Sequence, residues 1–148
     1  MPAQSTMLSP QQLIEAAKAP TLAYNQKDWN AVRAGITQDF VYDEVGTRRK
    51  VQGADQTIAL FQGWAEAMPD SKATFDNAVA SGDTVVLELT WRGTHSGPLQ
   101  TPKGSFAATG KKIEVRACAV VELANGKAKL QRHYFDMTTL LQQLGIAG

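Results

Sequence analysis

The chain has 148 residues, and its 15 Lys and Arg residues against 14 Asp and Glu residues give a net charge of +1. This length predicts one domain with one hydrophobic core, and the near-neutral charge gives no support for nucleic acid or an anionic membrane as a partner. Cys118 is the single cysteine, which excludes an internal disulfide and favours a reducing compartment.

Helical patterns dominate the first half of the chain. Ser9 is followed by proline and glutamine at the positions that a capping box requires, so a helix is expected to begin there. Pro20 lies inside the apolar run that follows, which predicts a kink or break. A short helix capped by Asp28 comes next, and a third helix is expected over residues 54–68.

Strand patterns dominate the second half. A polar loop is expected over residues 46–53 and a connection rich in glycine and proline over residues 95–110. β-branched and aromatic runs or alternating patterns predict strands at residues 40–45, 74–80, 84–94, 112–123 and 127–135. This order predicts an α+β fold in which the helices pack on one face of a curved, mostly antiparallel sheet.

The last two strands are joined by Asn125-Gly126, a strong signal for a two-residue type I′ hairpin. If the two strands pair regularly from this turn, three cross-strand pairs lie on the same face of the hairpin: Ala119–Arg132, Ala117–Tyr134 and Val115–Asp136. The two alanines leave space into which the larger partners project, so this face is predicted to line a pocket. His133 is expected on the outer face, although a β-bulge would invert part of the assignment.

Five short motifs follow one another in the second half of the chain. They are Gly93-Thr94-His95-Ser96-Gly97, Thr109-Gly110-Lys111, Gly126-Lys127, Tyr134-Phe135-Asp136 and Leu144-Gly145. From about Leu13 onward the chain resembles the SnoaL-like polyketide cyclases of the NTF2-like superfamily. The resemblance implies a cone-shaped α+β fold, a homodimer formed through the sheet and no cofactor. It also implies that Asp136 is the general acid/base of an intramolecular aldol cyclisation.

Residues 39–46 resemble the ketosteroid isomerase branch of the same superfamily, in which Asp43 would match the catalytic aspartate. Ala119 stands where that branch has a protonated aspartate, and Tyr24 is about one helical turn from the position of its oxyanion tyrosine. A third branch, the limonene-type epoxide hydrolases, shares Tyr134-Phe135-Asp136 but needs an Arg-x-Asp motif that the preceding strand region lacks.

Three ionisable residues are candidates for catalysis. Asp136 is either an acid/base, whose pKa an apolar cavity would raise, or the N-cap of the helix that follows it. Asp43 is either a second base or a charge at the end of an edge strand. His95 is either a pocket group that titrates near neutral pH or a turn residue between two glycines.

Four larger side chains are candidates for substrate binding, together with the space at Ala117 and Ala119. Arg132 and Tyr134 could donate to an anion or carbonyl, or instead form an ion pair with Asp136 and an ordinary core contact, respectively. Trp64 and Trp91 are candidates for the pocket wall or for the core. The two histidines are far apart and no cysteine accompanies them, so no metal site is expected.

The function predicted from these residues is cofactor-independent proton transfer on a hydrophobic carbonyl compound held in an internal pocket, leading to cyclisation or isomerisation. The alternatives are a non-catalytic module that binds a hydrophobic small molecule, an epoxide hydrolase or a protein-interaction domain. Residues 1–8 are expected to be a flexible N-terminus and residues 9–148 one domain. Because the sequence has no signal-peptide pattern and no apolar stretch of membrane-spanning length, we expect a cytoplasmic protein without a membrane partner.

Overall fold

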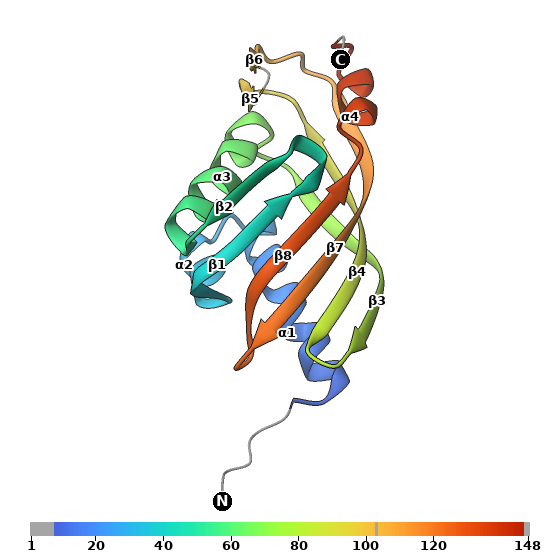
Figure 1. Cartoon of the computed structure of the whole chain (residues 1–148). Helices are drawn as coiled ribbons and strands as arrows, with labels where there is room; N and C mark the ends of the chain where they lie inside the picture. The colour runs from blue at the N-terminus through green and yellow to red at the C-terminus, as the bar shows by residue number, and fades with distance from the viewer. Residues whose placement is uncertain (1–7, 103, 147–148) are drawn as a thin grey trace, which may run out of the picture.

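The structure is a computed structural model that describes residues 8–102 and 104–146. Three helices, α1 (Pro10–Asn25), α2 (Trp29–Ala34) and α3 (Ala54–Ala67), cover one face of a curved sheet (Figure 1). The short helix α4 (Met137–Gln143) lies at one end of that sheet. This arrangement confirms the predicted α+β cone.

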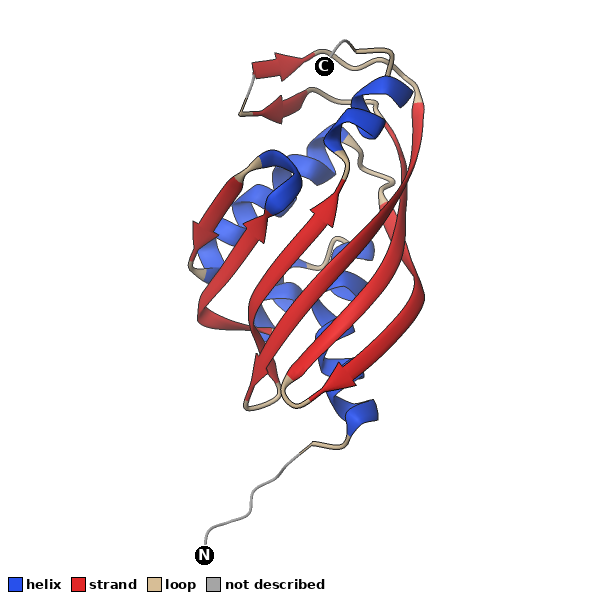
Figure 2. Cartoon of the chain, turned by 45° about the vertical axis from the view of Figure 1, so that its right-hand side comes forward, coloured by secondary structure: helices blue, strands red, loops and turns tan. Residues whose placement is uncertain are grey.

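The main sheet has six strands in the order β2-β1-β8-β7-β4-β3. Their bounds are β1 Ile36–Glu44, β2 Arg49–Gln52, β3 Lys72–Ser81, β4 Thr84–Thr94, β7 Lys112–Ala124 and β8 Lys127–Phe135. Neighbouring strands are antiparallel except for β1 and β8, which run parallel. The strands twist strongly, so the sheet wraps around the helices (Figure 2).

Four short elements fall in or at the edge of segments that the sequence predicts as loops. The 3₁₀ turn η1 (Val45–Thr47) and strand β2 lie in the predicted polar loop, and β5 (Leu99–Thr101) pairs with β6 (Gly104–Phe106) in the predicted connection. All are three or four residues long, so their hydrophobic alternation is too brief to identify them. Strand β2 forms the edge of the sheet beside β1 and there positions residues of the site.

The start of α1 follows the prediction, but its interior does not. The Ser9 hydroxyl accepts from the Gln12 backbone N–H at 3.1 Å, and the Gln12 side chain accepts from the Ser9 backbone N–H at 2.9 Å. Of the kink or break predicted at Pro20, the break does not occur, because α1 continues through it to Asn25. Pro20 is buried and packs close to Gly35, where an added Cβ would lie 3.2 Å from Pro20 Cγ. This packing offsets the hydrogen bond that proline removes from the helix.

The hairpin between β7 and β8 begins as predicted and then changes register. Asn125 and Gly126 have φ values of 53° and 79°, as a type I′ turn requires, and Ala124 pairs with Lys127. Leu123 then pairs with Ala128 but Glu122 pairs with Leu130, so Lys129 is an extra residue, a β-bulge.

The bulge reverses the facing of the rest of β8. Ala119 pairs with His133 and Ala117 with Phe135, in place of the predicted Arg132 and Tyr134. Gln131 and His133 are therefore buried on the concave face, under the helices. The predicted pocket face of β8 is wrong, because a single inserted residue exchanges the two faces of a strand.

Candidate functional site

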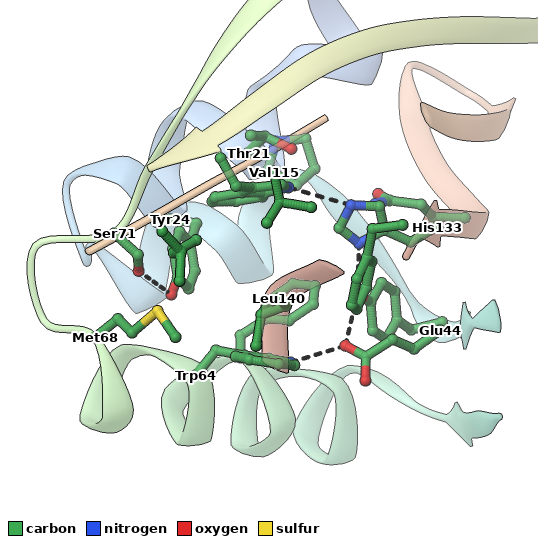
Figure 3. Close-up of a pocket in the computed structure, with 16 residues that line it drawn as sticks. Thr21, Tyr24, Glu44, Trp64, Met68, Ser71, Val115, His133 and Leu140 are labelled. Atoms are coloured by element: carbon green, nitrogen blue, oxygen red, sulfur yellow. Dashed lines mark hydrogen bonds between the residues drawn. The ribbon is translucent and has the colours of Figure 1, made fainter. Parts of the chain in front are cut away.

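A pocket of about 80 Å³ lies between the concave face of the sheet and the helices α1, α3 and α4 (Figure 3). Most of its wall is apolar, formed by Pro20, Phe61, Trp64, Met68, Trp91, Ile113, Val115, Phe135 and Leu140. Seven polar residues complete the lining: Thr21, Tyr24, Tyr42, Glu44, Ser71, Gln131 and His133. An apolar cavity with a few convergent polar groups is the usual form of a small-molecule site.

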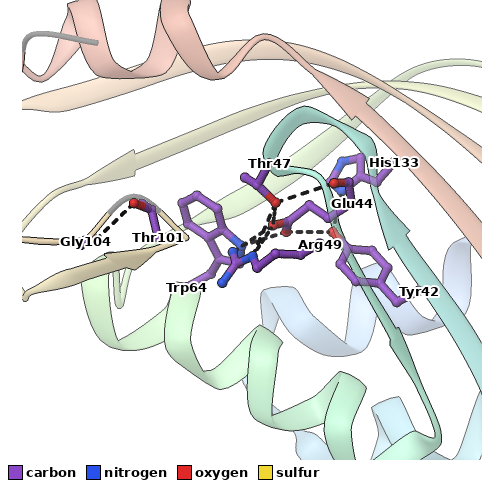
Figure 4. A network of polar contacts seen from close by, with 8 residues as sticks. All are labelled: Tyr42, Glu44, Thr47, Arg49, Trp64, Thr101, Gly104 and His133. Atoms are coloured by element: carbon purple, nitrogen blue, oxygen red, sulfur yellow. Dashed lines mark hydrogen bonds and ion pairs between the residues drawn. The ribbon is translucent and has the colours of Figure 1, made fainter.

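Glu44 is fully buried at the end of β1 and is the centre of a polar network (Figure 4). Its Oε1 accepts from Arg49 Nη2 at 2.7 Å, from Arg49 Nε at 3.0 Å and from the Thr47 hydroxyl at 2.6 Å. Its Oε2 accepts from Trp64 Nε1 at 2.8 Å and from the Tyr42 hydroxyl at 3.1 Å. Burial of this carboxylate is possible because one cation and three neutral donors satisfy it.

The network continues from Tyr42 to His133 on the adjacent strand β8. The Tyr42 hydroxyl lies 2.8 Å from His133 Nδ1, and Trp91 Nε1 donates to His133 Nε2 at 3.2 Å. An indole nitrogen can only donate, so Nε2 is the acceptor and Nδ1 carries the proton of the neutral ring. A directed chain of hydrogen bonds therefore runs from Trp91 through His133 and Tyr42 to Glu44.

Burial determines the protonation states of the two central groups. It lowers the pKa of His133 to about 4, although the negative charge of Glu44 acts in the opposite direction. Burial, and secondarily the charge of Glu44, raises the pKa of Tyr42 well above its ordinary value. At neutral pH the pocket therefore presents a neutral imidazole and a neutral phenol.

A second polar pair lies in the wall formed by α1 and the residues after α3. The Tyr24 hydroxyl is 2.6 Å from Ser71 Oγ, and either group can donate. Burial raises the pKa of Tyr24 to about 12, so its hydroxyl keeps its proton. Lys27 donates to the Ser71 carbonyl at 2.6 Å and lies over the Tyr24 ring, 4.4 Å from its centroid.

Asp136 is exposed outside the pocket, which corrects its predicted placement. It is the N-cap of α4: one carboxylate oxygen accepts from the Thr138 backbone N–H at 3.0 Å and the other from the Thr139 hydroxyl at 2.8 Å. These hydrogen bonds, that of Thr139 first, lower the pKa of Asp136. The structure thus gives Asp136 the capping role that the sequence left open, and not the raised pKa of a cavity acid.

Arg132 and Tyr134 are also outside the pocket, because the bulge directs them to the convex face. Arg132 forms an ion pair with Glu122 on β7 at 3.2 Å, and not with Asp136. Tyr134 is 42% exposed. The prediction that these two side chains line the pocket is therefore wrong.

Asp43 and His95 do not reach the pocket either. Asp43 lies between Tyr42 and Glu44 on β1 and so faces the opposite side of the sheet. His95 is fully buried in the loop after β4, where its Nδ1 accepts from the Thr109 backbone N–H at 3.2 Å. Its backbone bonds to Gly110 and Lys111 fasten this loop, which agrees with the turn alternative.

The remaining predicted residues divide into two groups. Trp64 and Trp91 lie in the pocket wall, and each also donates a hydrogen bond to the polar network. Ala119 is buried in the core cluster that includes Leu13 and Ala17 of α1, so that helix occupies the space predicted for a ligand. Ala117 packs against the same cluster and does not line the pocket.

Glu44 and His133, the carboxylate and the imidazole in the pocket lining, were not predicted as site residues. Glu44 could have been found, because it continues the alternation of Phe40 and Tyr42 and must share their buried face. The side of the sheet on which His133 lies depends on the β-bulge at Lys129. The sequence of the hairpin contains no pattern that predicts this bulge.

No helix within 8–102 or 104–146 is long and apolar enough to cross a membrane. The same residues contain no cluster of three or more His, Cys, Asp or Glu side chains placed to hold a metal ion.

The profile of the SnoaL-like polyketide cyclase family matches residues 14–144 of this chain. Among solved structures, a SnoaL-like protein from Jannaschia sp. CCS1 is 19% identical, with a TM-score of 0.83 over 99% of this chain and 100% of that one. IdmH from Streptomyces antibioticus is 24% identical, with a TM-score of 0.77 over 91% and 99% of the two chains. At these identities the likeness shows the fold.

A third solved structure has the same fold. An LEH-like epoxide hydrolase from M. tuberculosis is 22% identical, with a TM-score of 0.71 over 91% of this chain and 90% of that one. A search of curated protein sequences finds no match.

Proposed function

Because the chain belongs to the SnoaL-like polyketide cyclase family, we propose that it is a cofactor-independent enzyme that moves a proton on a hydrophobic carbonyl compound. The observation that carries this proposal is the hydrogen-bonded chain from His133 through Tyr42 to the buried carboxylate of Glu44. His133 takes the acid/base role that the sequence had suggested for Asp136.

His133 Nε2 is the atom that accepts the substrate proton. Its present donor, Trp91 Nε1, lies at 3.2 Å and is replaced when a substrate C–H or O–H approaches. Protonation gives an imidazolium whose Nδ1–H donates to Tyr42, which in turn donates to Glu44. The negative charge of Glu44 and that of the developing enolate both favour the imidazolium, so substrate raises the low pKa of the empty site.

The substrate oxygen requires a hydrogen-bond donor as its charge develops, and Tyr24 supports this part of the proposal. When the Ser71 hydroxyl donates to Tyr24, the Tyr24 O–H is free to donate into the pocket. The apolar wall excludes water and strengthens such a hydrogen bond. The surrounding aromatic rings favour a substrate that is largely apolar.

Exchange of α-protons in D₂O tests the proposal without knowledge of the natural substrate. The bicyclic ketone 2-tetralone is incubated with the wild type, with His133→Gln and with Asp136→Asn, and deuterium uptake is followed by NMR. We expect enzyme-dependent exchange in the wild type and in Asp136→Asn, with a loss of about 100-fold or more in His133→Gln. Equal exchange in His133→Gln would remove His133 from the mechanism.

A second function, binding without conversion, is favoured by a specific observation. Every side-chain polar atom of Glu44, Tyr42 and His133 already has a hydrogen-bond partner within the protein. A site that only binds an apolar ligand would have such a closed network. Saturable binding of 2-tetralone by calorimetry, with no exchange above the uncatalysed rate, would support this function.

A further inference from the structure

Gln131 differs from the other polar residues on the sheet side of the pocket. It lies on β8 two residues before His133, paired with Tyr42 on β1 and with Val121 on β7. The bulge at Lys129 directs its side chain to the concave face, where it lines the pocket and only 7% of the residue is exposed.

The Gln131 carboxamide makes no hydrogen bond to any residue within 8–102 or 104–146. This contrasts with Tyr42, Glu44 and His133, which are bonded to one another, and with Tyr24, which is bonded to Ser71. The Gln131 amide is also not among the fully buried unpaired side-chain atoms of the described residues, which are Thr37 Oγ1, Thr57 Oγ1 and His95 Nε2, so its polar atoms are open to the pocket. A polar group in this position is free to bond to water or to a ligand.

We propose that Gln131 is the specificity residue of the pocket and recognises an uncharged hydroxyl or enol group on an otherwise apolar ligand. The proposal rests on the proposed function of this pocket and deepens it. A carboxamide offers N–H donors and a carbonyl acceptor, and a hydroxyl both accepts and donates, so one hydroxyl can satisfy both ends. The enol formed when a carbonyl substrate is deprotonated has the same capacity.

The charges around the pocket favour a neutral group over an ionised one. Arg49, the cation nearest to the network, is already paired with the buried Glu44 at 2.7 Å. Glu44 is the only carboxylate among the 16 residues that line the pocket, and these include no Lys or Arg, so a ligand carboxylate or ammonium would meet no unpaired charge in the lining, which is costly. A hydroxyl requires only the neutral hydrogen bonds that Gln131 supplies.

Two probes of equal shape test this recognition, namely 2-naphthol and 2-methylnaphthalene, which differ by a hydroxyl in place of a methyl group. Their dissociation constants are measured by calorimetry for the wild type and for Gln131→Leu, which keeps the size of the side chain. We expect the wild type to prefer 2-naphthol by about tenfold. Gln131→Leu should lose this preference while still binding 2-methylnaphthalene.

The melting temperature of the ligand-free proteins is a second test of the role of Gln131. Because the amide has no partner within the described residues and is open to the pocket, Gln131→Leu should melt no lower than the wild type. Thr57→Val is the matched control: it removes a buried, unpaired hydroxyl on α3 that does not line the pocket. It should stabilise the protein, because its hydroxyl is fully buried, but leave the preference for 2-naphthol unchanged.

The possible failures are distinguishable. Binding of both probes with the same preference in wild type and Gln131→Leu would overturn the role of Gln131 and leave the pocket function standing. A lower melting temperature for Gln131→Leu would also overturn it, since that result means the amide has a structural partner. Failure of the wild type to bind either probe would overturn the pocket function and this proposal together.

Discussion

The indole nitrogen of Trp91 lies 3.2 Å from Nε2 of His133, and this contact determines which ring nitrogen carries the proton. In His95 the situation is reversed, because the Thr109 backbone N–H donates to Nδ1. The two histidines of this chain are therefore expected to hold opposite neutral tautomers.

Imidazole ¹⁵N chemical shifts at pH 7 check this first prediction. We expect the Nδ1–H form for His133 and the Nε2–H form for His95, with His133 titrating at a pKa of about 4. Trp91→Phe removes the donor to Nε2 and should allow His133 to populate both tautomers. The Nε2–H tautomer for His133 in the wild type would contradict the direction of the hydrogen-bond chain.

The buried imidazole of His133 also predicts how stability depends on pH. Its pKa is about 4 in the folded protein against 6.5 in the unfolded chain, so the unfolded state binds more protons between these values. The stabilisation is present above pH 6.5 and is lost as the pH falls toward 4, by about 3 kcal/mol in the free energy of unfolding. Urea unfolding of wild type and His133→Gln at several pH values measures the difference. Parallel curves for the two proteins would contradict this prediction.

Removal of the Glu44 charge should be strongly destabilising. Glu44→Gln keeps the size of the side chain but leaves Arg49, whose side chain is 26% exposed, without its carboxylate. Because this breaks a largely buried ion pair, we expect a loss of about 3 kcal/mol and a melting temperature lower by about 10 °C.

Asp55→Asn is the matched control for that substitution. It breaks the ion pair between Arg33 and Asp55, which has the same 2.7 Å separation but lies on the surface. Exposed pairs contribute little, so its melting temperature should change far less. Equal shifts for the two variants would show that burial of Glu44 does not matter.

The β-bulge at Lys129 gives a prediction about the whole pocket. Deleting Lys129 would restore regular pairing after the Asn125-Gly126 turn and turn Arg132 and Tyr134 toward the helices. We expect the deletion to lose the cooperative thermal transition, whereas Lys129→Ala should keep it because the side chain is exposed. Cooperative melting of the deletion variant, with His133 still in its buried tautomer, would show that the bulge is not required.

The fold was predictable because its signals are local and repeated. The Ser9 capping box, the Asn125-Gly126 turn and the alternation along β4 each specify an element without help from the rest of the chain. Pro20 shows the limit of such reasoning, because its helix is maintained by packing against Gly35, a residue of another segment.

The site was less predictable because it depends on register and on which side chains fill a space. One extra residue in β8 moved Arg132 and Tyr134 out of the pocket and placed Gln131 and His133 in it. The space at Ala119 is taken up by α1, a helix distant in sequence. Neither effect is visible in the periodicity of a single strand.

The most direct test of this account is to find which residues a bound ligand perturbs. Amide and imidazole NMR signals of the wild type are recorded during titration with 2-tetralone. We expect shifts at His133, Tyr42 and Gln131 and unchanged signals at Asp136 and Thr138, which lie outside the pocket. Shifts at Asp136 and Thr138 with none at His133 would contradict it and return the acid/base role to Asp136.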